Sequence, residues 1–209
     1  MSPPVDPARY AAYLGVMAVM VATPGPANLF AIATGAAGGR AAVIRAVAGM
    51  NAASLVWIGG AALGLAALAR AQPRLFHAMA YVGAAYLAWL AFLALRAALR
   101  GEAEAPHASG RAGRFPFRDG FAVQMSNPKA LVFTTVVLPP FIDPSRGVAG
   151  QLGVLAGTMI AMDLVTMTAY GFGGAALARR MTEPRFRRGF AAFTGLLLLA
   201  AATLIALRA

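Results

Sequence analysis

The sequence of 209 residues contains no cysteine, two histidines and seven acidic residues. The absence of cysteine excludes disulfides, thiolate metal sites and a cysteine nucleophile. Charged residues make up 12% of the chain, well below the ~25% that is usual in soluble domains. Hydrophobic residues make up 60%, and the mean hydropathy is +0.69. We therefore predict an all-α integral membrane protein, with residues 1–209 forming a single transmembrane domain.

Motifs of enzymes are missing as well. His77 and His107 fall in or near predicted loops, and the chain has no H-E-x-x-H, P-loop or G-x-S-x-G motif. Asp163 stands alone in its apolar run, whereas hydrolysis or a cation site needs several acids or soft ligands. We predict no enzymatic activity, no cofactor and no metal site. The net charge of +11 comes almost entirely from loop arginines, which favours contact with anionic lipids and predicts no nucleic-acid partner.

Six apolar runs are long enough to cross a bilayer, which takes ~20 residues per helix. Strands are disfavoured because these runs are continuously apolar rather than alternating. Two glycine pairs with small-xxx-small spacing, Gly60/Gly64 and Gly153/Gly157, predict close helix contacts. The predicted spans are Tyr10–Thr34, Ala41–Ala69, Leu75–Leu95, Phe117–Ile142, Val148–Ala178 and Phe190–Leu207.

The organisation of these spans favours an inverted repeat. The polar linker Gly101–Gly113 divides three spans from three, and an odd number per half gives the halves opposite orientations. We predict repeat A over about residues 8–98, a linker over about 99–114 and repeat B over about 115–208. The first span of each half carries a proline motif, and a polar position follows in the next span, at Asn51 to Ser54 and at Asp163.

A single lysine, Lys129, lies mid-way along the fourth predicted span. A charge at that depth costs roughly 2.5–3.5 kcal/mol on insertion scales and persists where it faces protein or a water-filled cavity. It belongs to Asn127-Pro128-Lys129, and a second proline motif, Pro24-Gly25-Pro26, interrupts the first span. Broken helices present unpaired amides and a positive dipole end, which suit a carboxylate. The alternative is a pair of packing kinks.

Other polar residues extend this candidate substrate site. Asp163 could bind a substrate ammonium, carry a coupling proton or form a structural pair with Lys129. Asn51 and Ser54 share a helix face, where they could bind substrate or join helices. Asn28 and Gln124 leave the same two alternatives open. Four aromatic residues could line a cavity or serve in packing: Trp57, Tyr86, Trp89 and Tyr170.

At these motifs the chain resembles the lysine-exporter/homoserine-threonine-resistance (LysE/RhtB) transporter family, over most of its length. The proline motifs in this order are the specific part, whereas the glycine and tyrosine pieces are weak by themselves. The chain departs from the family at Ser54, where many relatives have an acidic residue, and this argues against a cationic substrate. The matching pieces are Thr23–Asn28, Gly38–Arg40, Gly49–Ala66, Val82–Leu87, Phe117–Phe121, Asn127–Phe133 and Leu138–Phe141.

The resemblance implies a bacterial inner-membrane exporter of amino acids or their derivatives, driven by the proton gradient. The predicted partners are a small-molecule substrate, protons and the lipid bilayer, and a homodimer is compatible with the sequence. A channel or passive facilitator with the same fold is the alternative, and a membrane scaffold is a third reading. The predicted substrate-binding residues are Pro24, Gly25, Pro26, Asn28, Asn51, Ser54, Asn127, Pro128, Lys129 and Asp163, with Asp163 also predicted to couple protons.

The loop arginines predict the orientation. Twelve arginines fall in the first, third and fifth loops and five fall on the other side, so the positive-inside rule places both termini in the periplasm. Single cysteines introduced at residues 2 and 209 of this cysteine-free chain should react with a membrane-impermeant maleimide added outside spheroplasts. Labelling of either position only from the cytoplasm would contradict the six-span topology.

Overall fold

The computed structural model describes residues 3–23, 25–71, 73–100, 115–173, 176, 180 and 182–207. Over these residues the chain is helical and contains no strand, which confirms the all-α prediction. The elements are α1 (Pro7–Ala22), α2 (Pro26–Ala71), α3 (Pro73–Arg100), α4 (Pro116–Met125), α5 (Pro128–Val132), the π-helix η1 (Phe133–Val137), the 3-10 helix η2 (Pro139–Phe141), α6 (Val148–Phe172) and α8 (Pro184–Ala206).

Proline marks the start of most of these helices. At the first helical position its fixed φ suits a helix, and its missing N–H would have had no partner there. At α1 the preceding residue completes the cap, because the Asp6 carboxylate accepts hydrogen bonds of 3.0 Å from the amides of Ala8 and Arg9. Seven of the nine elements of the described part of the chain therefore begin at a proline.

Two of the predicted spans meet inside the long helix α2. Gly39 has φ 67° and ψ −171°, so it is not helical and separates the segments 26–38 and 40–71. A positive φ strains residues that carry a Cβ, which explains a glycine at this bend. The first predicted span, Tyr10–Thr34, consists of α1 and the first segment of α2, and the second consists of the remainder of α2.

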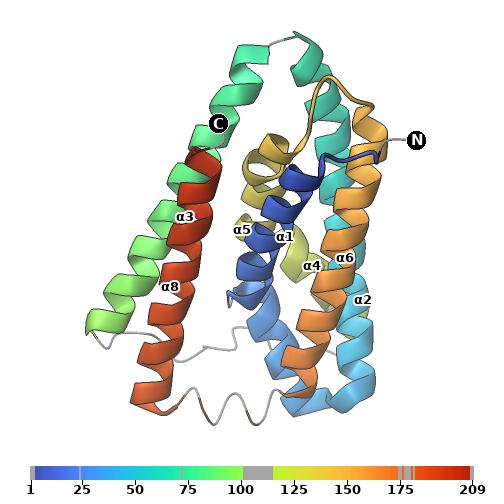
Figure 1. The fold of residues 1–209 in the computed structure, drawn as a ribbon. Coiled ribbons are helices and arrows are strands. Elements are labelled where there is room, and N and C mark those ends of the chain that lie inside the picture. Colours follow the sequence, from blue (N-terminus) through green and yellow to red (C-terminus); the bar gives the residue numbers. More distant parts are fainter. Residues whose placement is uncertain are drawn as a thin grey trace.

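The helices form two groups that lie side by side in Figure 1. On the left, α3 and α8 run alongside each other and make most of their tertiary contacts together. On the right, α2 packs against both α4 and α6. The shorter helices α1 and α5 lie between these groups, and both groups contact them or η1. This arrangement places the two short helices at the centre of the protein.

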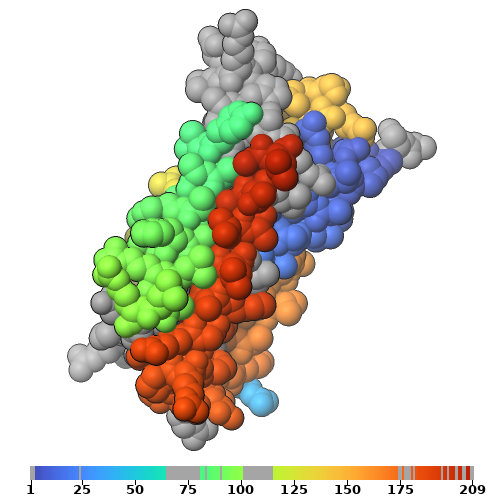
Figure 2. All heavy atoms as spheres, turned by 60° about the vertical axis from the view of Figure 1, so that its left-hand side comes forward, coloured from blue at the N-terminus to red at the C-terminus, as the bar shows by residue number. Residues whose placement is uncertain are grey.

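The outer surface of the α3 and α8 pair is apolar. Figure 2 shows the two helices running together along one face, and the exposed apolar side chains of these helices include Val82, Trp89 and Phe92 on α3 and Phe193 and Leu196 on α8. Large apolar patches are rare on soluble monomers and are typical of surfaces that face lipid. Within the described part of the chain, Pro26–Gly64 and Val148–Phe172 are each long and apolar enough to cross a membrane.

Helix α2 approaches its neighbours at glycines. A Cβ built on Gly49 would lie 2.0 Å from the carbonyl oxygen of Phe117, and one on Gly120 would lie 2.3 Å from that of Ala46. Gly35 meets the backbone of Gly171 in the same way, which joins α2 to α6. The predicted close contacts at Gly60/Gly64 and Gly153/Gly157 are wrong among the described residues, none of which lies within 4 Å of a Cβ at those glycines.

Gly49→Ala and Gly120→Ala should each destabilise the protein by roughly 1–3 kcal/mol, because the added methyl group meets rigid backbone. Gly157→Ala is the matched control and should not destabilise the protein, because the added methyl group has room and alanine has a higher helix propensity than glycine. Thermal unfolding in detergent, followed by circular dichroism, measures the difference. Equal effects at the three positions would show that the contact between α2 and α4 tolerates an extra carbon.

Candidate substrate site

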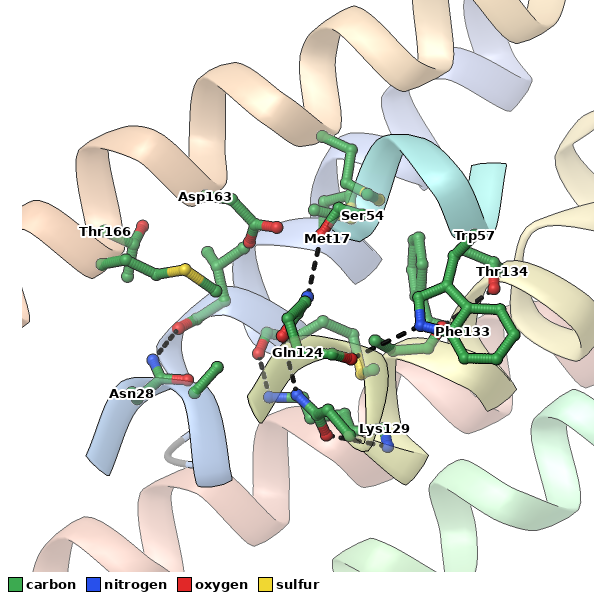
Figure 3. Close-up of a pocket in the computed structure, with 17 residues that line it drawn as sticks. Met17, Asn28, Ser54, Trp57, Gln124, Lys129, Phe133, Thr134, Asp163 and Thr166 are labelled. Atoms are coloured by element: carbon green, nitrogen blue, oxygen red, sulfur yellow. Dashed lines mark hydrogen bonds between the residues drawn. The ribbon is translucent and has the colours of Figure 1, made fainter. Parts of the chain in front are cut away.

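A cavity lies where the end of α1 faces the junction of α4 and α5. Helix α1 ends at Ala22 and α2 begins at Pro26, while α4 ends at Met125 and α5 begins at Pro128. Helix α6 completes the wall with Met159, Asp163, Thr166 and Met167. The cavity has a volume of about 50 Å³ and is lined by apolar and polar side chains together (Figure 3). A polar space of this size can hold ordered water.

Lys129 enters this cavity from α5 and binds the end of α1. Its Nζ donates hydrogen bonds to the backbone oxygens of Met20 and Thr23, the second at 2.7 Å. In a regular helix the carbonyl of Met20 would accept the amide of residue 24, and that residue is a proline without an N–H. The ammonium therefore supplies the donor that the sequence removes. Its positive charge also complements the negative end of the α1 dipole.

Two further side chains satisfy the neighbouring carbonyls of α1. Tyr170 on α6 donates its hydroxyl to the oxygen of Ala22 at 2.7 Å, whose helical partner would have been the missing amide of Pro26. Asn28 on α2 donates from Nδ2 to the oxygen of Val21 at 3.2 Å. The broken end of α1 is thus held by α2, α5 and α6 together. In a membrane interior, where water is scarce, unpaired carbonyls would be costly.

The start of α5 satisfies its own donors. The Asn127 side chain accepts the backbone amide of Lys129 at 3.0 Å, and the Asn127 carbonyl accepts the amide of Ala130 at 3.1 Å. The prediction of free amides at this break is therefore wrong for Lys129 and Ala130. Asn127 is itself fixed by Gln124, whose Oε1 accepts from it at 3.1 Å and whose Nε2 donates to Ser54 at 2.9 Å. This chain of hydrogen bonds links α2, α4 and the start of α5.

Asp163 faces the same cavity without a partner. It is 9% exposed, and its carboxylate makes no hydrogen bond or ion pair with the described residues. Lys129 is not within the 4.0 Å of an ion pair, and in Figure 3 the two side chains lie on opposite sides of Gln124. A direct Lys129–Asp163 pair is therefore absent from this conformation. Buried acids are otherwise paired, so a carboxylate aimed into a cavity indicates a ligand or a proton.

The structure brings together half of the residues predicted for the site. Asn28, Ser54, Asn127, Lys129 and Asp163 line the cavity. Gly25, Pro26, Asn51 and Pro128 are described but do not line it, and Pro24 lies outside the described residues. Asn51 is buried on α2, where it donates to the oxygen of Val47 at 3.0 Å and leaves its own oxygen unpaired.

The residues of the cavity wall that the sequence analysis did not predict are mainly apolar. Four methionines line the cavity, as do Trp57, Phe133, Thr134 and Thr166. Of the four aromatic residues predicted to line a cavity or to serve in packing, Trp57 lines the cavity. Tyr170 instead binds the end of α1, and Tyr86 and Trp89 contact each other on α3. In an apolar sequence a methionine by itself does not indicate a cavity. The spacing of the wall residues does indicate a shared surface, since Met159, Asp163 and Thr166 lie on one face of α6 and Met17 and Met20 lie on one face of α1.

Comparison with known proteins gives relatives along most of the chain. The family model of LysE type translocators matches residues 18–208. An uncharacterized membrane protein of Pseudomonas aeruginosa is 39% identical over 66% of this chain and 65% of its own length, just under two thirds. A threonine efflux protein of Salmonella typhi is 28% identical over 82% of this chain and 81% of its own.

A homoserine/homoserine lactone efflux protein of Salmonella typhimurium is 29% identical over 81% of this chain and 80% of its own. No solved structure matches the chain. The family model covers the elements that build the cavity, from the end of α1 through α2, α4, α5 and α6. The chain belongs to the LysE type translocator family.

Proposed function

We propose that this protein is a secondary exporter of amino acids or their derivatives across the bacterial inner membrane, coupled to protons. The observation that carries the proposal is the unpaired Asp163 carboxylate in a cavity that also holds the Lys129 ammonium. An amino acid carries the two complementary charges. The efflux activities in the names of two relatives, for threonine and for homoserine and its lactone, support the same substrate class.

In this proposal each charged end of the substrate has its own receptor. The substrate ammonium binds Asp163, which has no other partner among the described residues. The substrate carboxylate binds Lys129, which has three N–H donors and uses two on α1. Asp163 also carries the coupling proton, because protonation removes the charge that holds the ammonium. Substrate and proton then occupy the same carboxylate in turn, which is a simple basis for antiport.

We further propose that the single transmembrane domain is a 3+3 inverted repeat of six spans with both termini in the periplasm. Corresponding helices of the two halves pack together, α2 on α6 and α3 on α8. Each half also has its helix ends at the central cavity, near Pro26 and near Pro128. Of the proposed linker, about residues 99–114, residues 101–114 lie outside the described residues. A homodimer remains compatible with this architecture.

Transport by purified protein in vesicles with an imposed pH gradient tests the function. Labelled L-threonine, L-homoserine and a panel of other amino acids serve as probes. We expect accumulation against a concentration gradient that a protonophore abolishes. Asp163→Asn should lower the rate at least about tenfold, since one charge-assisted hydrogen bond contributes ~1.5–3 kcal/mol.

Asp143→Asn is the matched control for the loss of an acid. Asp143 follows the fourth predicted span, where hydrogen bonds donated by Ser145 and the nearby arginines Arg9 and Arg146 lower the pKa of its carboxyl group. This variant should transport at nearly the normal rate. Transport that only equilibrates the probe would instead indicate a passive facilitator, and an unchanged rate in Asp163→Asn would remove that residue from the mechanism.

A further inference from the structure

The contact between Lys129 and α1 resembles, group for group, the contacts that an amino acid would make in the cavity. A primary ammonium group binds backbone carbonyls at the negative end of a helix. The substrate brings its own primary ammonium together with a carboxylate. The ammonium groups of lysine and substrate can therefore occupy equivalent positions at the end of α1, in the cavity that Asp163 also lines.

We propose that the substrate exchanges with this contact: its carboxylate draws Lys129 away from α1, and its ammonium replaces the lysine at the Met20 carbonyl. The proposal rests on the proposed export of amino acids and makes it more specific. Lys129 is then a specificity-determining residue for a free carboxylate. It is also a latch on α1, because its departure removes two of the hydrogen bonds that fix the helix end.

The number of hydrogen-bonding groups explains why both ends of the substrate are required. A carboxylate without an ammonium would leave the carbonyls of Met20 and Thr23 unpaired once Lys129 moved. An ammonium without a carboxylate would bind Asp163 and leave Lys129 in place. Unpaired buried polar groups are unfavourable, so the exchange costs least with a zwitterion, whose ammonium replaces the lysine at Met20 and leaves only the Thr23 carbonyl without its donor. The ligands that unlatch α1 are therefore zwitterions, such as free amino acids.

The release is local, because the remaining contacts of α1 do not involve Lys129. In the middle of α1, Tyr13 still donates to the oxygen of Leu155 at 2.8 Å. Near the start of α1, Arg9 still donates to the oxygen of Ile142 at 3.0 Å. We therefore expect movement at the end of α1 next to the cavity, while its first turns stay in place against η2 and α6.

A single cysteine at Ala22 reports this release. The chain has no other cysteine, and Ala22 is the last helical residue of α1. The alkylation rate of Ala22→Cys is measured in the vesicles used for transport, with four probes: L-threonine, L-homoserine, L-threoninamide and 3-hydroxybutyrate. Threoninamide lacks the carboxylate and 3-hydroxybutyrate lacks the ammonium. The two amino acids should raise the rate about tenfold, the scale of one lost charge-assisted hydrogen bond, and the other two probes should not.

Two variants separate a latch from general loosening. In Lys129→Met the alkylation should be fast with or without a probe, whereas Arg9→Met, which removes another hydrogen bond from a cation to a carbonyl, should keep the response to L-threonine. If Lys129→Met does not fold, Lys129→Arg takes its place and should retain a carboxylate-dependent response. If Lys129 had a purely structural role, its substitution would change the alkylation rate measured without a probe, but in the unsubstituted protein that rate would not depend on the substrate carboxylate.

The outcomes distinguish this proposal from the proposed function. Transport of L-threonine or L-homoserine with an unchanged alkylation rate would overturn the latch and leave the exporter standing. An equal response to L-threonine and L-threoninamide would overturn the role of the carboxylate. Vesicles that transport neither amino acid would overturn the exchange together with the proposed export of this substrate class.

Discussion

The interaction on which the site depends is the capping of the broken end of α1. Prolines at positions 24 and 26 remove two amides that would have bound the carbonyls of Met20 and Ala22. In an apolar interior those carbonyls need other donors, and side chains of α5 and α6 provide them, while Asn28 of α2 binds the carbonyl of Val21 between them. A gap in one helix thereby becomes the point at which α1, α2, α5 and α6 are joined.

This capping places the charges of the cavity. Lys129 is held at α1, so it does not neutralise Asp163, and the carboxylate is left facing the cavity without a protein partner. The second break behaves differently, because Asn127 caps α5 from within the same segment. The break before α5 is therefore capped by the neighbouring Asn127, whereas the break after α1 is capped by Lys129 from another helix, which in our proposal the substrate displaces. The asymmetry gives the site one fixed wall and one exchangeable contact.

Packing on the other side of the cavity supports the fixed wall. Gly49 and Gly120 bring the backbones of α2 and α4 into contact, and hydrogen bonds from Gln124 and Asn127 continue from that contact to the start of α5. Close-packed backbone has few ways to adjust. Movement in this region is therefore more easily accommodated at the end of α1 than at α4. This agrees with the proposal that the contact between Lys129 and the end of α1 is the one that the substrate exchanges.

Much of the framework could be predicted from the sequence. Long apolar runs determine a helical membrane protein, since only helices satisfy their own backbone in lipid without closing a barrel. Prolines determine where the helices end, and the rarity of lysine and acid in these runs singles out Lys129 and Asp163. These features are local, because each follows from a residue's own backbone chemistry or from its cost in an apolar solvent.

The tertiary structure alone decided which groups meet. The pattern of residues could not tell that Lys129 binds α1 rather than Asp163, that Tyr170 serves as a cap, or that Asn51 lies away from the cavity. The pattern of residues also could not distinguish a glycine in close helix contact, such as Gly49, from Gly157, which has no described atom within 4 Å of its Cβ position. Partners of this kind depend on the rotation and register of helices far apart in sequence. A proline ends a helix, and a charge is costly in lipid, at its own position in the sequence whatever the tertiary structure.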